Sequence, residues 1–545
     1  MTHETSREPF RSFPLIDNRY DGPGTMMSIG WVGVGSLLIL STLIMGAFEL
    51  EITPPPWWDE GWTLCVARQW VETGHYGCLL KGQPAPPLLA GHFPVVASIA
   101  AGFRLFGIGI WQARLVELLY AFGALGLLYY LTAELYNRKV AVGTLVLVLF
   151  FPAGWEMHPL IMGRQVLGEM PMVCFLLAGF VCLLSVERHR AWWLGAVGFW
   201  GLALFTKLQV RPFWMLSLAV PILLSLWRRE WSLAKLLGSA TAGSWAVYFL
   251  LGWLKSMLLQ GHTMAMPPMN GLLQVSAIVL VPMVRLEALV FTVSHLMPTI
   301  CGLAYAAGSM VNRWRGQAPI GLLDAVRTML LTFSLGWYGW FVALSLGGER
   351  YAFPLWFLAT PFVAALLCEW SQGYDIRALV TSLGSLIRAG RGGAVQTRQV
   401  SVVILIVLIV GTAVQARYDF RGREDGSAFH RAVDFLHRQV PADALIETYE
   451  SELLFLLPGP YHYPPAELDV GLIRKGWEKE LHLSYDALGA DPDYVVVGEF
   501  GRRAGIYKAI VETGQVRLIS QIGRYQIYER VRPFPALSVG RADRR

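Results

Sequence analysis

The chain has 545 residues, of which 54% are hydrophobic and 15% are charged, and its formal net charge at pH 7 is +6. A soluble domain carries about 25% charged residues, so this composition excludes a soluble globular protein and indicates a polytopic membrane protein. The modest positive charge fits basic loops beside a membrane and does not indicate nucleic-acid binding. The 21 tryptophans and 20 tyrosines suit interfacial belts at the membrane surfaces.

Hydrophobic runs predict membrane-spanning helices along most of the chain. A membrane helix needs about 20 mostly apolar residues. By this criterion we predict eleven spans, at 27–48, 111–133, 139–156, 166–186, 191–206, 212–227, 236–256, 287–311, 322–346, 351–370 and 400–416. The stretch 271–286 fits either an interfacial helix on the outer side or part of a longer eighth span. The first span is too long for the apolar core of a cleaved signal peptide.

The basic residues of the connecting loops support this count. With eleven spans, the basic clusters fall on one side of the membrane: Arg7, Arg11, Arg19, Arg138, Lys139, Arg188, Arg190, Arg228, Arg229, Lys235, Arg313, Arg315, Arg377, Arg388, Arg391 and Arg398. The positive-inside rule assigns that side to the cytoplasm. The loop 49–110 and the C-terminal segment then face outward.

The segment 417–545 has the composition of a soluble domain. We predict strands at 444–449, 493–498 and 525–529, and a helix at 427–440, where apolar residues recur at helical spacing. The sequence therefore predicts two domains, a transmembrane module 1–416 and an extracytoplasmic α/β domain 417–545.

The loop 49–110 carries an acidic pair, Asp59 and Glu60, directly after a run of prolines and tryptophans. A carboxylate beside a membrane surface is costly if it is buried, which indicates a chemical role. We predict Asp59 as a general base and Glu60 as its support. The alternative is that Asp59 only caps a helix and Glu60 favours the helix dipole.

Two amphipathic stretches of the same loop predict helices lying in the membrane plane. Trp62, Val66 and Trp70 share one helical face after the acidic pair, and 95–106 forms a second amphipathic stretch. Cys65 and Cys78 also lie in this loop. In an extracytoplasmic loop they either form a disulfide or remain two thiols, because spacing alone does not fix their geometry.

Short motifs recur along the chain in a recognisable order: Trp58-Asp59-Glu60, His92-Phe93-Pro94, Leu105-Phe106-Gly107, Arg114, Gly163-Arg164, Gly168-Glu169-Met170-Pro171, Thr206-Lys207 and Arg350-Tyr351-Ala352-Phe353-Pro354. This series resembles the GT-C glycosyltransferases, and most closely the branch of the protein O-mannosyltransferases and the aminoarabinose transferases acting on lipid A. The resemblance covers about 15–370 and the outward domain.

The resemblance implies a polyprenyl-phosphate-linked sugar donor and an active site at the outer membrane surface. It also implies that Asp59 is the catalytic acid/base and that Glu169, where the family usually has Asp, is the second acid. The Glu-Lys-Pro-Pro stretch of the lipid A branch is missing, and 92–94 is closer to the His-Pro-Pro of the mannosyltransferases. The sugar, a hexose or a pentose, and the acceptor, a lipid, glycan or protein, therefore stay open.

A lipid phosphate requires cations at the membrane surface. Arg350, Lys207, Arg211 and Arg164 all lie at predicted outer span ends, and Tyr351 follows Arg350 in the family-like motif. The alternative is that these long side chains only snorkel towards water. We predict Arg350 as the main phosphate ligand because arginine makes bidentate contacts, with Lys207 second.

His92 is either a hydrogen-bonded structural residue or a ligand. No cofactor is indicated, and no Cys/His cluster has the spacing of a zinc site. A divalent metal ion held by Asp59, Glu169 or His92 stays open.

We predict a membrane glycosyltransferase of the bacterial inner membrane that works on the extracytoplasmic side. We predict an inverting enzyme, because an in-line displacement inverts the anomeric carbon. The alternative is a transporter or flippase of a polar or lipid-linked substrate. Transporters tend to show inverted repeats and polar residues at mid-membrane. The chain shows no internal repeat and gathers its acids and cations at one surface, which favours the enzyme.

Overall fold

In this computed structural model, residues 25–87, 89–262, 277–375, 377, 394–421, 426–457, 459–476 and 483–532 are described. The chain divides into two compact units. The first lies within Met1–Pro54, Gly91–His262 and Pro268–Arg423, and the second contains Pro55–Ala90 and Glu424–Arg545. Each unit is described in turn.

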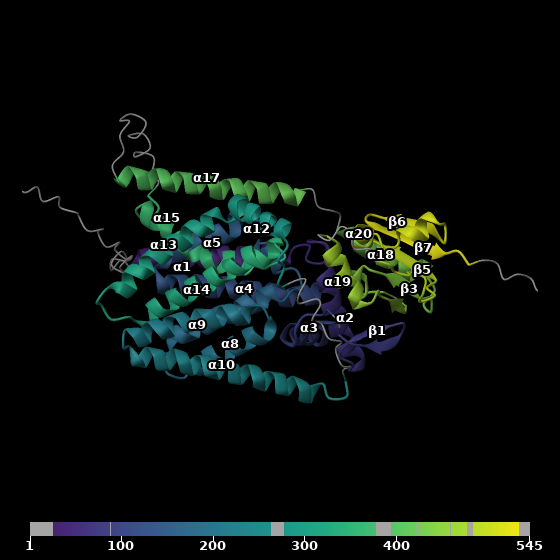
Figure 1. Cartoon of the computed structure of the whole chain (residues 1–545), viewed down its shortest axis with the longest axis horizontal. Coiled ribbons are helices and arrows are strands. Elements are labelled where there is room, and N and C mark those ends of the chain that lie inside the picture. The colour runs from purple at the N-terminus through teal and green to yellow at the C-terminus, as the bar shows by residue number, and fades with distance from the viewer. Residues whose placement is uncertain are drawn as a thin grey trace, which may run out of the picture. The chain divides into compact units, whose positions relative to one another are not determined.

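The first unit is helical, and its long helices α4, α9, α10 and α17 run roughly along one direction (Figure 1). Its elements are α1 (Thr25–Ala47), α3 (Phe93–Phe106), α4 (Ile110–Leu135), α5 (Arg138–Phe150), α6 (Pro159–Met162), α7 (Glu169–Ser185), α8 (Trp192–Thr206), α9 (Val210–Trp227), α10 (Trp231–Leu258), α12 (Pro282–His295), α13 (Met297–Arg315), α14 (Leu322–Ala343), η2 (Glu349–Ala352), α15 (Phe353–Trp370) and α17 (Ala394–Arg421).

Every predicted span overlaps one of these helices, although two differ in detail. The span predicted at 139–156 is shorter, since α5 ends at Phe150. The span predicted at 287–311 is the pair α12 and α13, which are bent by 81° at a short break. Within the described ranges, four helices are long and apolar enough to cross a membrane, or five if that bent pair is one span. The count of eleven stays a prediction.

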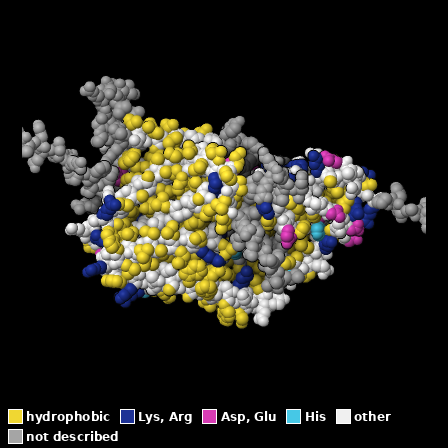
Figure 2. Space-filling view, in the orientation of Figure 1, with side chains coloured by type: hydrophobic (Ala, Val, Ile, Leu, Met, Phe, Trp, Pro, Cys, Tyr) yellow, Lys and Arg dark blue, Asp and Glu magenta, His cyan; other side chains and the backbone are white. Residues whose placement is uncertain are grey.

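The surface of the helical unit is apolar. Large hydrophobic side chains such as Leu37, Phe249 and Val293 are each about two-thirds exposed, at 66%, 65% and 66%, and Figure 2 shows hydrophobic side chains over much of this unit. Exposed apolar surface of this extent is unfavourable in water. The chain is therefore an integral membrane protein.

Small residues bring the helices of this unit close together. A Cβ atom added at Gly302 would lie 2.7 Å from the backbone nitrogen of Val363, so α13 and α15 pack at short range. The same holds for α8 and α10, where Gly201 faces Val247 at 2.4 Å. Inside a bilayer no hydrophobic driving force brings helices together, so membrane helices associate through close packing at small residues.

The second unit is an α/β domain, as predicted. Its elements are α2 (Trp58–Thr73), β1 (Cys78–Leu80), β2 (Gln83–Ala85), α18 (Ser427–Gln439), β3 (Ile446–Thr448), η3 (Ser451–Leu453), β4 (Tyr461–His462), α19 (Ala466–Lys475), β5 (Tyr494–Val497), α20 (Glu499–Ala504), α21 (Lys508–Glu512), β6 (Val516–Ile522) and β7 (Tyr525–Arg530). β1 and β2 form a hairpin, and the other strands form one sheet in the order β4-β3-β5-β7-β6.

The sheet is mixed. β4, β3 and β5 run parallel, with Ile446 opposite both Tyr461 and Tyr494, whereas β7 and β6 pair antiparallel. The predicted strands at 444–449, 493–498 and 525–529 correspond to β3, β5 and β7. The parallel strands place the loop after β3, with Tyr449 and Glu450, at the carboxyl edge of the sheet, where open α/β sheets usually bind ligands.

The division into units differs from the predicted one. The loop residues Pro55–Ala90 belong with the C-terminal residues rather than with the helical module, and the boundary near residue 416 moves to Arg423. The physical reason is the packing of α2. Trp62 and Val66, which we expected to face the membrane surface, are fully buried, and the Trp62 ring lies 4.6 Å from that of Tyr463. Protein, rather than lipid, covers the apolar face of α2.

Candidate functional site

In the helical unit, two of the predicted motifs meet at the ends of α7 and α8. Glu169 is the first residue of α7, and its buried carboxylate forms an ion pair with Lys207, which follows the last residue of α8. A Cβ atom added at Gly168 would lie 3.6 Å from the Thr206 carbonyl oxygen, so the two chain segments are in direct contact. Arg350 also acts electrostatically on the Glu169 carboxylate. One acid is therefore balanced by two cations.

His92 extends this cluster. It precedes α3 and is exposed, and the cations Arg211, Lys207 and Lys255 all act on its ring electrostatically. Lys255 lies near the C-terminal end of α10 and was not among the predicted site residues. The signal that identifies it is the one that pointed to Lys207, a lysine at the predicted outer end of a span.

Aromatic rings hold two of the cations. The Arg211 guanidinium carbon lies 4.4 Å from the centre of the Tyr248 ring, and that of Arg350 lies 5.2 Å from the centre of the Tyr351 ring. Tyr351 is itself fixed, because Trp337 Nε1 donates a hydrogen bond of 2.8 Å to its carbonyl oxygen. Cation–π contacts orient an arginine without neutralising its charge. We call Lys207, Arg211, Lys255 and Arg350 the cation cluster.

Arg164, a further predicted candidate, is used differently. Its guanidinium donates to the carbonyl oxygens of Met45, Gly46, Phe48 and Thr53, at 2.6 to 3.1 Å. These groups belong to the end of α1 and the segment that follows it, where helix carbonyls lack intrahelical donors. The geometry shows Arg164 as the cap of α1.

Asp59 and Glu60 lie in the first turn of α2, in the second unit. Glu60 is fully buried, and its carboxylate accepts a 3.2 Å hydrogen bond from the Trp57 backbone N–H. Glu60 therefore makes the helix-capping contact that the sequence analysis gave as the alternative role of Asp59. Asp59 is half-buried.

Asp59 acts electrostatically on a second carboxyl group, Asp469 on α19. Asp469 is 3% exposed, and one of its oxygens accepts a 2.6 Å hydrogen bond from the Tyr449 hydroxyl. Burial raises the pKa of Asp469 to about 7, even though the hydrogen bonds from Tyr449 and Tyr463 oppose this shift. The neighbourhood of Asp59 is thus acidic and aromatic, whereas the cation cluster is basic.

The two loop cysteines are neighbours. Cys65 and Cys78 are buried free thiols that share a hydrogen bond, and Cys65 Sγ lies 2.9 Å from the Tyr461 hydroxyl. Of the two alternatives that the sequence left open, a disulfide or two thiols, the structure shows two thiols.

In the part of the chain that the structure describes, no three His, Cys, Asp or Glu side chains are grouped as ligands of a metal ion. Of the residues considered for a metal, Asp59 belongs to the second unit, and Glu169 and His92 belong to the first. The sequence left a divalent metal ion at these residues open, and it stays open.

Comparison with known proteins supports the predicted resemblance. Residues 92–253 match the family described as dolichyl-phosphate-mannose-protein mannosyltransferase. This segment is less than a third of the chain and includes His92, Glu169, Lys207 and Arg211. An uncharacterized protein of Aquifex aeolicus (strain VF5) is 30% identical over 201 residues, which are 36% of this chain and 42% of that protein. The match thus spans less than half of the relative.

Solved structures show a common fold over nearly the whole chain. The crystal structure of ArnT from Cupriavidus metallidurans bound to undecaprenyl phosphate has a TM-score of 0.57 and 15% sequence identity, covering 92% of this chain and 98% of that one. The apo structure of the same protein gives a TM-score of 0.56 at 15% identity, covering 93% and 98%. The predicted GT-C fold, which the chain shares with ArnT, is therefore confirmed.

Proposed function

We propose that this chain is a membrane glycosyltransferase that moves a sugar from a polyprenyl-phosphate carrier to an acceptor hydroxyl on the extracytoplasmic side of the bacterial inner membrane. The observation that carries the proposal is the cation cluster at helix ends of a GT-C fold. Lys207 and Arg350 act on the Glu169 carboxylate, and Arg211, Lys207 and Lys255 act on the His92 ring. ArnT, which shares this fold, was solved with undecaprenyl phosphate bound.

The cation cluster suits a phosphate that gains charge during the reaction. When the bond between the anomeric carbon and the phosphate oxygen breaks, a phosphodiester with one negative charge becomes a monoester with up to two. Fixed cations stabilise the charge that develops on a leaving group. Positive charge gathered at one place attracts an anion. We assign Arg211, Lys255, Lys207 and Arg350 to the donor phosphate.

The acceptor needs a base. A hydroxyl group becomes a good nucleophile when a positioned carboxylate takes its proton, and the sequence resemblance assigns this role to Asp59. The acceptor oxygen would attack the anomeric carbon opposite the departing phosphate, the proton would pass to Asp59, and the anomeric configuration would be inverted. Glu169 is assigned to holding Lys207 in place.

The proposal is tested with the full chain in proteoliposomes that contain a polyprenyl-phosphate sugar labelled in the sugar. Transfer of label to an acceptor, with release of polyprenyl phosphate, is the expected result. Movement of the intact labelled lipid between leaflets, with no cleavage in either wild type or Asp59→Asn, would instead establish a flippase. Mass spectrometry of lipids that co-purify with the protein identifies the sugar to use.

A matched control tests whether the effect depends on the cation cluster and not on the net charge of the protein. Arg188 is an exposed arginine of the same unit, paired with Glu134 at 2.8 Å. Arg188→Gln removes one positive charge without touching the cation cluster, so its KM for the donor should equal that of wild type.

A further inference from the structure

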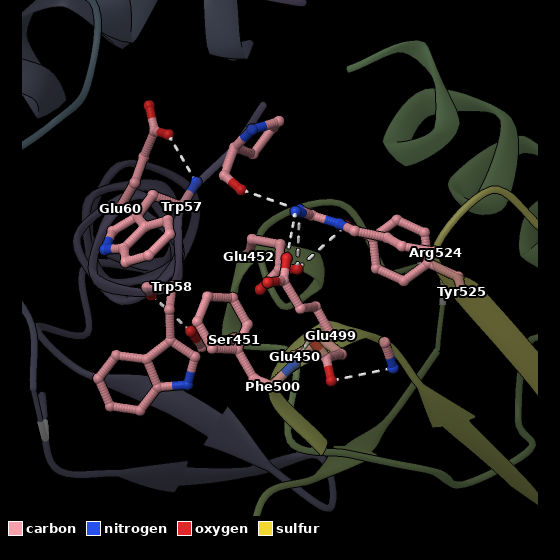
Figure 3. A network of polar contacts seen from close by, with 12 residues as sticks. Trp57, Trp58, Glu60, Glu450, Ser451, Glu452, Glu499, Phe500, Arg524 and Tyr525 are labelled. Atoms are coloured by element: carbon pink, nitrogen blue, oxygen red, sulfur yellow. Dashed lines mark hydrogen bonds and ion pairs between the residues drawn. The ribbon is translucent and has the colours of Figure 1, made fainter. Parts of the chain in front are cut away.

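The first turn of α2, which carries Asp59, is tied to the C-terminal part of the chain by its own backbone (Figure 3). Arg524 Nη2 donates a 3.1 Å hydrogen bond to the carbonyl oxygen of Pro56, and the Ser451 hydroxyl donates to that of Trp58. Both tied carbonyl groups lie within three residues of Asp59. The position of this carboxylate is therefore set by residues far along the sequence.

Arg524 is itself held rigidly. Its side chain is 7% exposed, and Nη2 lies 3.2 Å from Glu452 Oε1, while Nη1 lies 3.7 Å from Glu499 Oε2. The Tyr525 hydroxyl donates to the same Glu452 oxygen at 3.0 Å. Because a guanidinium is a planar fork, one arginine can hold a carboxylate and a backbone carbonyl at the same time.

Close packing accompanies these bonds. A Cβ atom added at Gly61 would lie 2.1 Å from the Ser451 carbonyl oxygen, so α2 meets η3 with no space for a side chain. The Trp57 ring packs edge-on against Phe500 at 5.2 Å. The turn that carries Asp59 thus has contacts on several sides.

Selection for stability alone would favour apolar residues over the buried Arg524–Glu452 pair. Both groups are buried, and Glu452 Oε2 accepts no hydrogen bond of normal geometry from any described residue. A buried ion pair that is incompletely hydrogen-bonded is often less stable than apolar residues of similar size. An apolar pair at these positions could not donate the hydrogen bond that Arg524 makes to the Pro56 carbonyl oxygen.

We propose that Arg524, held by Glu452 and assisted by Ser451, is a positioning residue for Asp59, so that the C-terminal domain takes part in catalysis. The inference rests on the proposed function of Asp59 as the general base. A base must lie within hydrogen-bond reach of the proton it takes, and a misplacement of about 1 Å can lower the rate ~100-fold. The domain then acts on the chemical step, not only on acceptor binding.

We call Arg524, Glu452 and Ser451 the clamp on the first turn of α2. Three variants test this clamp in the full-length protein. Arg524→Lys keeps the charge but loses the fork, Ser451→Ala removes one tether, and the double variant Arg524→Met/Glu452→Met removes the pair without leaving a buried charge. Arg517→Gln is the matched control, since Arg517 is 71% exposed and pairs with Glu529 in the same domain.

Two measurements separate positioning from a general loss of structure. We expect kcat to fall ~10- to 100-fold in Arg524→Lys and in the double variant, with KM for the lipid donor unchanged. We also expect faster amide hydrogen exchange in a peptide covering Trp57–Val66, while peptides of the central strands β5 and β7 keep their protection. Ser451→Ala should show both effects more weakly, and Arg517→Gln neither.

The clamp is refuted if the double variant folds, with normal protection of β5 and β7, and turns over like wild type. It is equally refuted if only KM changes. The outcome for Asp59→Asn distinguishes this failure from failure of the proposed function. If Asp59→Asn is inactive while the double variant is fully active, the function stands and the clamp does not; if Asp59→Asn retains transfer, the assigned base is wrong.

Discussion

The two units of this protein use their charged residues in opposite ways. In the helical unit, Lys207 and Arg350 act on the Glu169 carboxylate, and Arg211, Lys207 and Lys255 act on the His92 ring. Tyrosine rings lie beside Arg211 and Arg350. In the second unit, the buried acids Glu447, Glu450 and Glu452 are occupied by tyrosines, backbone N–H groups and Arg524. The first arrangement gathers positive charge at helix ends, where it can attract an anionic ligand, whereas the second uses buried acids to hold segments of the chain together.

The contrast is strongest between the adjacent acids Asp59 and Glu60. We expect Asp59→Asn to lower kcat ~1000-fold, because a general base contributes about 10²- to 10⁴-fold, with little change in thermal stability. Glu60→Gln should keep most of its turnover but unfold at a lower temperature, since its carboxylate caps α2. Turnover of labelled donor and the unfolding midpoint, measured on the same preparations, check both. Equal turnover in the two variants would contradict the division of roles.

A second comparison sets a glycine of the second unit that packs closely on another element against a glycine of the helical unit that faces open space. Gly61→Ala places a methyl group 2.1 Å from a backbone oxygen, so we expect a loss of ~3 kcal/mol in stability, at the upper end for overpacking. Gly126→Ala on α4 is the matched change, because nothing lies within 4 Å of its added Cβ. Unfolding in detergent, followed by tryptophan fluorescence, measures both. A Gly61→Ala protein as stable as Gly126→Ala would show that α2 and η3 are not in close contact.

The acids of the second unit should also make stability depend on pH. The pKa of Asp469 is about 7 in the folded protein, whereas the ordinary value, which we take for the unfolded chain, is 3.8. Between these two pH values the folded state therefore binds more protons than the unfolded state. Stability therefore falls as pH rises through this range, by ~3 kcal/mol between pH 5 and pH 8. We expect Asp469→Asn to reduce this fall. Asp434→Asn, which changes an exposed acid on α18 in the same unit, should not. An unchanged slope in Asp469→Asn would assign the pH dependence to other groups.

Substitutions in the cation cluster should change the affinity for the lipid donor rather than the stability of the protein. We expect Arg211→Gln to raise KM for the lipid donor ~10- to 30-fold, the loss of one charge-assisted contact to phosphate. Arg211→Lys should lie between this variant and wild type, because lysine keeps the charge but not the planar contact with Tyr248. Donor titrations at two salt concentrations measure the effect. If the increase in KM is no greater than in Arg188→Gln, Arg211 does not contact the donor.

Much of the helical unit was predictable because hydropathy and charge are local properties. Runs of apolar residues locate the helices, and the basic loops indicate which ends share a side of the membrane. Lys207, Arg211 and Arg350 were therefore assigned to a common site, and the structure joins them through Glu169 and His92. Lys255 was missed although the same rule applies to it.

The second unit was harder to predict for a physical reason. The strands β3, β5 and β7 follow from β-branched and aromatic runs, but the apolar face of α2 carries no mark of whether protein or lipid covers it. Packing of Trp62 on Tyr463 decides this in favour of protein. Arg164 is a similar case, since its sequence position fits a phosphate ligand and its contacts are those of a helix cap.

The sequence by itself determined the membrane class, the order of the motifs, the acidic pair and the cations at helix ends, because each depends on residues close together in the chain. Only the tertiary structure decided what holds Asp59. Arg524 and Pro56 are separated by 468 positions, and Ser451 and Trp58 by 393. Contacts at such separations follow from how the domain packs, and no local pattern encodes them.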